Sequence, residues 1–380
     1  MARVYEFFAG GGMARQGLGP GWTCLFANDV DFRKALTYQA NFGAGEIKVA
    51  DIRSLGPADL PGRADLMWGS FPCQDLSLAG VGAGLAGERS GTFYPFWDIV
   101  RALREEGRAP RLIALENVCG TLTSRGGRDF HAICETAHDA GYRPGALVIN
   151  ADLFVPQSRP RLFVIAVRND LSIDPALISP QPLAPFHTSG LRRAVDALPD
   201  TLRAGMLWWN LPTPGRRVRA FADEIEETPS GVAWHSSAET QSLLAKMSLT
   251  NRAKVTAAMR AGRRMVGGVY RRTRIEEGGV RVQRAEVRFD DVSGCLRTPA
   301  GGSSRQLILV IDGPKVRSRL LSARETARLM GLPETYRLPK NYNEAYHLTG
   351  DGVVVPVVRH LAQYLLEPLL ADPTPARQLA

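Results

Sequence analysis

The fold is decided by Val4-Tyr5-Glu6-Phe7-Phe8-Ala9-Gly10-Gly11-Gly12-Met13. The apolar start of this stretch predicts a buried strand over residues 4–8. The glycines predict a turn into a helix at residues 13–17, and they allow a ligand to approach the backbone closely. The stretch therefore predicts a strand–turn–helix unit at a binding site.

The same alternation of strands and helices continues through the first half of the chain. Further strands are predicted at residues 23–27, 47–50, 64–69, 112–115, 146–149 and 162–167, with helices at 32–41, 94–106 and 129–140. Such alternation with short links predicts an α/β fold with a mostly parallel sheet, covered on both faces. Ligands of these folds bind beyond the carboxyl ends of the strands.

The pattern changes after Val167. Four prolines between residues 175 and 185 indicate a linker or hinge, and the stretch from there to about Arg288 is irregular and basic. A capping-box spacing at Ser322 predicts a helix to Met330, and a last helix is expected at residues 358–370. The predicted divisions are a catalytic domain at 1–185, a second domain with its hinge at 186–341, a returning segment at 342–371 and a disordered tail at 372–380.

Composition is that of a soluble globular protein of 380 residues, with 44% hydrophobic and 22% charged residues. No run of about 18 apolar residues predicts a membrane span, and the N-terminus lacks a signal-peptide pattern. The five cysteines are scattered and have no CxxC spacing. They argue against a disulfide framework and a zinc site, and for a reducing cytosol.

The positive charge is concentrated in one segment. The net charge is +9, and residues 252–288 contain 11 Lys and Arg against 3 Glu. The bases are mostly arginines interleaved with Gly, Val and Tyr270. A solvated helix face is the plain interpretation, but the interleaving favours contact with phosphates and base edges.

Polar residues at the first strand ends indicate a nucleoside cofactor. A dinucleotide fingerprint needs a glycine three residues after Gly12, and Arg15 stands there, which disfavours nicotinamide and flavin dinucleotides. Asp29, after Asn28, is placed to accept from ribose hydroxyls, and Asp51 from an adenine amino group. Each acid alone is more often a cap or turn residue.

The candidate nucleophile is Cys73, in Ser70-Phe71-Pro72-Cys73-Gln74, just after the apolar run Leu66-Met67-Trp68. A thiol at a strand end, held by a proline turn, faces a cleft and can act once deprotonated. The alternative is an inert buried thiol. Glu116, at a neighbouring strand end, would stand beside it, and the glycine-rich residues 78–91 resemble a closing lid or a surface loop.

A pair of arginines opens the last strand of this half. Arg159 and Arg161, in Gln157-Ser158-Arg159-Pro160-Arg161, form either an anion or carbonyl clamp or an exposed edge.

These motifs together resemble the bacterial C5-cytosine DNA methyltransferases that use S-adenosylmethionine. The resemblance rests on Phe8-Ala9-Gly10 with Gly12, Phe71-Pro72-Cys73-Gln74, Glu116-Asn117-Val118 and the Gln157–Arg161 element. Late in the chain it adds residues 324–334 and 350–355. It covers the whole chain except the basic segment. It implies a Rossmann-like methyltransferase domain with a doubly wound, mostly parallel seven-stranded sheet, and a smaller, irregular target-recognition domain.

The resemblance also implies roles for individual residues. Cys73 would add to C6 of a flipped-out cytosine, with Glu116 on N3 and the amine, Arg161 on the O2 carbonyl and Asn117 positioning the loop. Arg159 would belong to the same catalytic set. S-adenosylmethionine, and its product S-adenosylhomocysteine, would be held without a metal by Phe8, Ala9, Gly10, Gly12, Asn28, Asp29, Asp51, Ile52, Phe71, Pro72, Asp351 and Val353. Double-stranded DNA would be contacted by Gln74, Ser77, Arg89, Arg271, Arg272, Arg274, Arg281 and Arg284.

The chain departs from the family at a few positions near the cofactor. Glu6 replaces the usual Asp, Met13 a common glycine, Val30 a frequent aromatic, and Asp351 an asparagine. These changes affect cofactor contacts rather than the cysteine chemistry. We expect a cytoplasmic monomer that acts separately from any partner restriction endonuclease.

Three other functions compete with this one. Methylation of RNA, such as tRNA, is disfavoured by the large basic insertion. A non-catalytic DNA-binding relative is disfavoured by the retained Cys73, Glu116, Arg159 and Arg161, and an oxidoreductase by Arg15.

Overall fold

The computed structural model describes residues 1–71, 90–275, 279, 281–298 and 305–371. The chain forms two compact units. Unit 1 contains Met1–Asn150, Pro160–Pro214 and Val353–Ala380, and unit 2 contains Ala151–Arg159 and Gly215–Gly352. The divisions predicted from the sequence fall at other residues, because 186–214 pack with unit 1 and 342–352 with unit 2. The assignment of a task to each unit stays a prediction.

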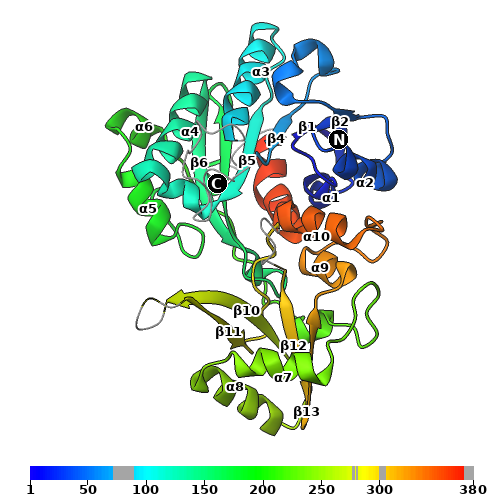
Figure 1. The fold of residues 1–380 in the computed structure, drawn as a ribbon. Helices are drawn as coiled ribbons and strands as arrows, with labels where there is room; N and C mark the ends of the chain where they lie inside the picture. Colours follow the sequence, from blue (N-terminus) through cyan, green and yellow to red (C-terminus); the bar gives the residue numbers. More distant parts are fainter. Residues whose placement is uncertain (72–89, 276–278, 280, 299–304, 372–380) are drawn as a thin grey trace, which may run out of the picture. The chain divides into compact units, whose positions relative to one another are not determined.

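A seven-stranded sheet is the centre of unit 1 (Figure 1). Its strands are β1 (Ala2–Phe7), β2 (Trp22–Asp29), β3 (Ile47–Val49), β4 (Leu66–Gly69), β5 (Leu112–Val118), β6 (Tyr142–Asn150) and β7 (Pro160–Arg168). The order is β3-β2-β1-β4-β5-β7-β6, and β7 alone runs antiparallel to its neighbours. The mostly parallel sheet predicted from the sequence is confirmed. Its order changes direction beside β1, and β1, β4 and β5 place their carboxyl ends at one edge.

Helices cover the sheet because their apolar faces match it. The helices of unit 1 are α1 (Met13–Leu18), α2 (Phe32–Phe42), α3 (Phe93–Glu105), α4 (Arg128–Asp139), α5 (Ser189–Asp196), α6 (Asp200–Gly205), α11 (Val355–Leu361) and α12 (Glu367–Leu370). A core cluster joins the sheet to the buried side chains of α3, α4, α5 and α6. A short ribbon of β8 (Ile178–Ser179) and β9 (Trp208–Trp209) adds to β6.

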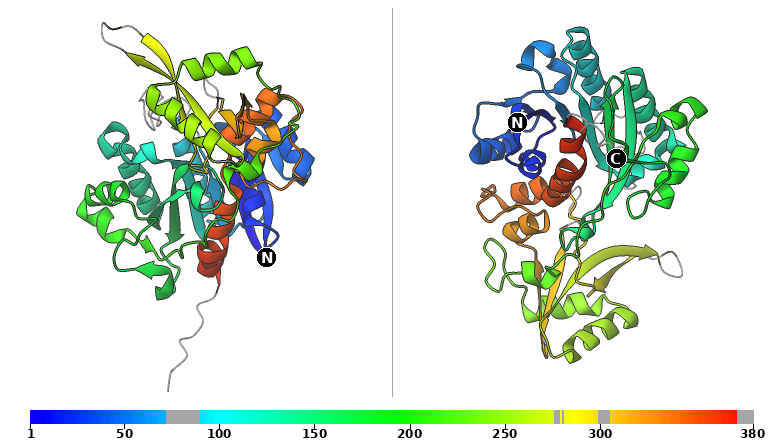
Figure 2. Two further views of the ribbon diagram at one scale, coloured as in Figure 1. Left: turned by 90° about the horizontal axis from the view of Figure 1, so that it is seen from below. Right: turned by 180° about the vertical axis from the view of Figure 1, so that it is seen from behind.

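The C-terminal helix α11 packs against α1, near the start of the chain (Figure 2). The contact is so close that a Cβ on Gly17 would lie 2.4 Å from Cβ of Val358 and 2.7 Å from the carbonyl oxygen of Val355. The helical stretch Tyr342–Leu370 is long and apolar enough to cross a membrane by length and composition, but 61% of its most apolar window is buried. Burial of this kind is typical of a core helix of a soluble protein.

Unit 2 is built on a four-stranded antiparallel sheet in the order β11-β10-β12-β13. Its elements are α7 (Ser237–Ala245), α8 (Leu249–Arg260), β10 (Met265–Ile275), β11 (Arg281–Arg288), β12 (Leu307–Asp312), β13 (Lys315–Leu320), α9 (Ala323–Leu329) and α10 (Tyr342–Asp351). Val269, Ala285, Val287, Leu309 and Ile311 form a core with α7 and α8.

The region up to Arg288 is therefore more regular than its sequence suggested. It contains the helices α5, α6, α7 and α8 and the long strands β10 and β11, with an irregular stretch mainly between β9 and α7. Most arginines of β10 and β11 lie on exposed strand positions, which hides the strand pattern. The helix predicted at the Ser322 capping box is confirmed. Ser322 Oγ accepts from Glu325 N at 3.2 Å, and the Glu325 carboxylate accepts from Ser322 N at 2.7 Å.

Candidate functional site

The turn after β1 has backbone angles that few side chains adopt. Phe8, Gly10 and Gly12 have φ values of 56°, 54° and 76°. A Cβ on Gly12 would lie 2.5 Å from the Phe42 ring, so only glycine fits there. A Cβ on Gly10 would meet nothing closer than 4.0 Å, which leaves that side of the turn open. Strained backbone beside open space is typical of a ligand site, as the sequence predicted.

The two polar residues at the end of β2 have different surroundings. Asn28 Nδ2 donates to the carbonyls of Lys48 at 3.1 Å and Ala50 at 2.8 Å, so its amide joins β2 to the β3 side. Asp29 Oδ2 accepts from Gly10 N at 2.7 Å, and its Oδ1 accepts from Asp31 N at 2.8 Å. Burial raises the pKa of Asp29. Asp29 thus ties the glycine turn to β2 and brings a carboxylate beside Gly10.

The next predicted cofactor residues divide into one exposed acid and two core residues. Asp51 is exposed, and its Oδ1 accepts from Arg53 N at 2.9 Å at the start of a short 3₁₀ turn, Ile52–Ser54. Ile52 and Phe71 are 3% and 4% exposed, and the Phe71 ring centroid lies 5.4 Å from that of Phe93. Asp51 is therefore accessible, whereas Ile52 and Phe71 supply apolar packing beside it.

Glu116 and Arg161 form an ion pair between neighbouring strands. Glu116 Oε1 lies 3.1 Å from Arg161 Nε, and the two side chains are 9% and 15% exposed. Glu116 is on β5 and Arg161 is on β7, where Arg161 pairs in register with Val118. A nearly buried carboxylate and guanidinium at strand ends are suited to polar recognition of a planar, hydrogen-bonding ligand.

Asn117 anchors the end of the segment that leads toward Cys73. Its Nδ2 donates to the carbonyl of Phe71 at 3.3 Å, and its Oδ1 accepts from Val118 N at 2.8 Å. This geometry suits the positioning role predicted for Asn117. Pro72, Cys73, Gln74, Ser77 and Arg89 lie outside the described residues, as does most of the predicted lid.

The arginines at 159 and 161 do not act as one pair. Arg159 is 2% exposed and belongs to unit 2. Its guanidinium donates to the carbonyls of Leu296 at 2.7 Å, Gly350 at 2.8 Å and Gly352 at 2.8 Å. Arg159 thus bonds to carbonyls of the protein itself, and its predicted part in a clamp on a ligand stays a prediction.

Gln157 is a residue whose importance the sequence reasoning missed. It is fully buried; its Nε2 donates to the carbonyl of Leu329 at 2.7 Å, and its Oε1 accepts from Leu296 N at 3.0 Å. Its place at the start of the Gln157–Arg161 motif was the available signal. Gln157 and Arg159 together join the nine residues 151–159 to the rest of unit 2.

Asp351 and Val353 lie on the two sides of the division between the units. Asp351 ends α10 and accepts a hydrogen bond from Thr298 Oγ1. Val353 is 5% exposed. Their predicted cofactor contacts stay predictions.

Glu6, which the sequence singled out only as a departure from the family, is a buried carboxyl. It is 1% exposed, its Oε1 accepts from Arg15 N at 3.3 Å, and among the described residues its Oε2 has no hydrogen-bond partner. Burial raises the pKa of Glu6 to about 8. The replacement of the family's usual Asp at this position was the signal that could have drawn attention to it.

Buried cysteines elsewhere are poorly suited to nucleophilic chemistry. Burial raises the pKa of the Cys24 and Cys134 thiols to about 12 and that of Cys119 to about 11. These three remain thiols at neutral pH. In the ranges that the structure describes, no group of three His, Cys, Asp or Glu side chains is arranged to hold a metal ion.

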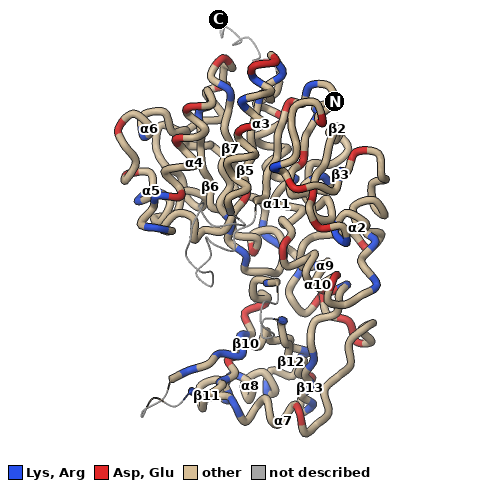
Figure 3. The backbone as a smooth tube through the Cα atoms, turned by 45° about the horizontal axis from the view of Figure 1, so that its top comes forward, with Lys and Arg blue, Asp and Glu red and all other residues tan. Residues whose placement is uncertain are grey.

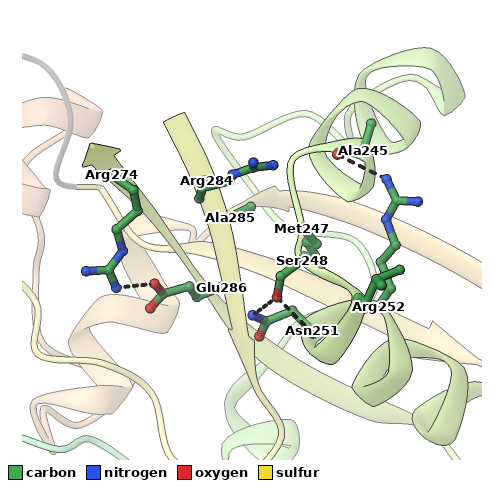
Figure 4. Close-up of a pocket in the computed structure, with 10 residues that line it drawn as sticks. Ala245, Met247, Ser248, Asn251, Arg252, Arg274, Arg284, Ala285 and Glu286 are labelled. Atoms are coloured by element: carbon green, nitrogen blue, oxygen red, sulfur yellow. Dashed lines mark hydrogen bonds and ion pairs between the residues drawn. The ribbon is translucent and has the colours of Figure 1, made fainter. Parts of the chain in front are cut away.

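The predicted DNA contacts of the basic segment gather on one hairpin. Arg271, Arg272 and Arg274 are on β10, and Arg281 and Arg284 are on the paired strand β11 (Figure 3). All but the half-buried Arg284 are exposed. A pocket of about 500 Å³ lies beside β11, lined by Arg274, Arg284 and Glu286, by Ser248 of the α7–α8 turn and by Arg252 in the first turn of α8 (Figure 4).

Comparison with known proteins identifies the family. The model of the C-5 cytosine-specific DNA methylase family matches residues 2–367. The chain belongs to this family.

Relatives of this methylase include bacterial enzymes of similar length. It is 28% identical over 375 residues to the Type II methyltransferase M.NlaX of Neisseria lactamica, covering 98% of each chain. It is 27% identical over 362 residues to M.HhaI of Haemophilus parahaemolyticus, covering 95% of this chain and 93% of that protein.

Solved structures share the fold of this methylase. The Dnmt2 methyltransferase of S. pombe matches with a TM-score of 0.56 and 18% identity, covering 97% of this chain and 99% of that one. A putative DNA modification methyltransferase from an E. coli prophage matches with a TM-score of 0.56 and 15% identity, covering 97% and 99%. The Rossmann-like fold predicted from the sequence is confirmed, and the methylase is an enzyme that acts on C5 of cytosine.

Proposed function

We propose that the chain methylates C5 of a flipped-out cytosine in a specific duplex DNA sequence, with Cys73 as the nucleophile and S-adenosylmethionine as the methyl donor. The observation that carries this proposal is the nearly buried Glu116–Arg161 pair at adjacent strand ends, beside the segment that leads to Cys73. A base must leave the stack to reach such a site, because its C5 and C6 are inaccessible within the duplex.

The cofactor site is the edge formed by the glycine turn and the next two strand ends. The open side of Gly10, the carboxylate of Asp29 and the exposed Asp51 suit a nucleoside, with Phe8, Ala9, Gly12, Ile52 and Phe71 shaping the turn and its apolar floor. Arg15 lies inside α1, so the turn lacks the third glycine of a dinucleotide site. S-adenosylmethionine, when bound there, supplies an electrophilic methyl group.

The protein groups make the cytosine reactive. The Cys73 thiolate adds to C6 and forms a C–S bond, while the C5–C6 π electrons shift to C5 and, through the conjugated C4–N3 bond, onto N3 and O2. Glu116 hydrogen-bonds to N3 and the exocyclic amine, and Arg161 stabilises the charge that develops on O2. C5 then accepts the methyl group, a water-mediated base removes the C5 proton, and Cys73 leaves as thiolate.

The remaining residues support this reaction. Asn117 holds the Phe71 carbonyl and so positions the start of the Cys73 segment. Gln74, Ser77 and Arg89 would contact DNA around the flipped base. The arginines of the β10–β11 hairpin would contact the duplex. We further propose that the enzyme is a cytoplasmic monomer that acts apart from any cognate restriction endonuclease.

A labelled-methyl transfer assay tests the function. Purified protein is incubated with duplex DNA or with tRNA, and incorporation at C5 is measured for the wild type, Cys73→Ser and the control Cys134→Ala. We expect incorporation into DNA, none with Cys73→Ser and near wild-type turnover with Cys134→Ala, since Cys134 is a buried core thiol. Incorporation into tRNA alone, or substantial turnover by Cys73→Ser, would contradict the proposal.

A further inference from the structure

The β10–β11 hairpin has two chemically different faces. In an antiparallel pair, residues opposite each other point to the same face. Val269, Ala285 and Val287 are buried against α7 and α8. Tyr270 pairs in register with Glu286, and Arg272 with Arg284, so these residues and Arg274 share the face opposite to Val269, Ala285 and Val287.

One carboxylate lies between two arginines on this outer face. Glu286 Oε2 is 3.2 Å from Arg272 Nε, and its Oε1 pairs with Arg274 Nη2. The side chains of Arg272 and Arg274 are 55% and 52% exposed, while that of Glu286 is 31% exposed. The carboxylate is therefore the most enclosed member of the trio, and the guanidinium groups extend outward from it (Figure 4 shows the Arg274 pair).

Stability does not account for this arrangement. Exposed ion pairs contribute little to folding, because water screens them and ordering the long side chains costs entropy. The ion pairs to Glu286 instead fix the direction in which each arginine side chain points. A guanidinium has five N–H donors, and the contact to Glu286 uses one edge of each arginine while leaving another edge able to donate outward.

We propose that Arg272 and Arg274 read guanine in the DNA major groove, and that Glu286 is the positioning residue that sets their direction. The inference rests on the proposed function and concerns which sequence the enzyme selects. The major groove admits a two-stranded ribbon, and a bidentate contact from arginine to guanine O6 and N7 is the commonest specific base contact there.

The other arginines of the hairpin have a different task. Arg271 lies on the opposite face from Glu286, because it pairs in register with Ala285. It has no carboxylate in register to orient it and suits a phosphate contact. Phosphate contacts position a protein on DNA without reading sequence.

The test is a sequence readout. A duplex library with random flanks around cytosine is methylated, and the positions of 5-methylcytosine are determined by bisulfite sequencing. The variants are Arg272→Lys, Arg274→Lys and Glu286→Gln, with Arg271→Ala and Arg263→Ala as controls. Arg263 is an exposed arginine between α8 and β10, outside the hairpin.

The wild-type motif should contain guanine outside the target base pair. Each lysine variant should lose discrimination for one guanine by roughly 5- to 150-fold, because lysine keeps the charge but lacks the bidentate fork. Glu286→Gln should weaken the preference at both positions. Arg271→Ala should leave the motif intact and make the slope of log K against log salt less negative by about 0.9.

Two results would overturn the inference in different ways. If the motif is unchanged in all three variants, or if the wild-type motif contains no such guanine, Arg272 and Arg274 do not read bases and the inference fails. If the wild-type enzyme methylates no cytosine in the library, the proposed function fails together with the inference. If the Glu286→Gln protein does not fold, the two lysine variants, which retain the Glu286 carboxylate, still test the inference.

Discussion

Glu6 makes the stability of unit 1 depend on pH in an unusual direction. The carboxyl is fully buried, and burial raises its pKa from an ordinary value of 4.5 to about 8. At about 1.36 kcal/mol for each pKa unit, the charged form is disfavoured in the folded protein by roughly 5 kcal/mol. Between pH 4.5 and 8 the folded state binds more protons than the unfolded state, so this group removes stability as the pH rises.

The substitution Glu6→Gln isolates this contribution. We expect the free energy of unfolding of the wild type to fall relative to the variant by roughly 3 kcal/mol between pH 5.5 and 8. An amide in the same place adds an offset that does not depend on pH, so the slope alone is diagnostic. Urea unfolding followed by circular dichroism at half-unit pH steps measures it.

Glu105→Gln is the matched control, because it removes one carboxylate at an exposed position of α3. Its unfolding free energy should run parallel to that of the wild type across the range. If the Glu6→Gln curve also runs parallel, the Glu6 carboxyl is not buried in its neutral form and the reasoning fails.

Three further predictions concern the site and the hairpin. Arg161→Ala should abolish methylation and lower stability by about 3 kcal/mol, since it leaves Glu116 nearly buried without its guanidinium; an active, equally stable variant in urea unfolding would contradict this. Asn117→Ala should lower the rate of methyl transfer several-fold at unchanged DNA affinity, and weakened DNA binding instead would argue against a positioning role. Replacement of Arg271, Arg272 and Arg274 together by alanine should weaken DNA binding. It should also make the slope of log K against log salt less steep, by about 0.9 for each phosphate that is no longer neutralised. An unchanged slope would place the hairpin away from DNA.

Much of unit 1 could be predicted because its signals are local. Most of its seven strands contain an apolar run, with β3 (Ile47-Lys48-Val49) as the exception, and the strand ends carry the polar residues that motif spacing pointed out. Element ends were less predictable. The polar residues Glu116 and Asn117 predicted that β5 ends before them. In the structure β5 continues to Val118, because its backbone pairs with β7 as far as Arg161.

The hairpin of unit 2 could not be predicted from residue pattern. The first half of β10 is buried without alternation, its residues 271–275 are all exposed, and Gly267 and Gly268 weaken any strand propensity. A Cβ on Gly267 would lie 2.6 Å from the Phe289 ring. Close packing against this ring, and not a turn, therefore requires glycine at this position. Only tertiary pairing makes the strand.

The partners of Arg159 were also beyond the sequence. Its carbonyl acceptors come from Leu296 and Gly350, which lie 137 and 191 residues further along the chain. The motif indicated the residue and its preference for carbonyl oxygens, but long-range folding decides which carbonyls those are. The same holds for Gln157 and Leu329, which are 172 residues apart.

The way in which Gln157 and Arg159 hold unit 2 has an evolutionary consequence. Most of their hydrogen bonds go to main-chain carbonyls, those of Leu296, Leu329 and Gly350, which every amino acid offers in the same form. Substitution of Leu296 or Leu329 therefore leaves these acceptors in place, whereas a Cβ on Gly350 would lie 3.0 Å from backbone atoms of Arg297 and Thr298. The segment 151–159 is therefore held within unit 2 largely by acceptors that survive a change of side chain, and an engineered exchange of residues 215–352 would need to preserve the backbone path that meets this segment.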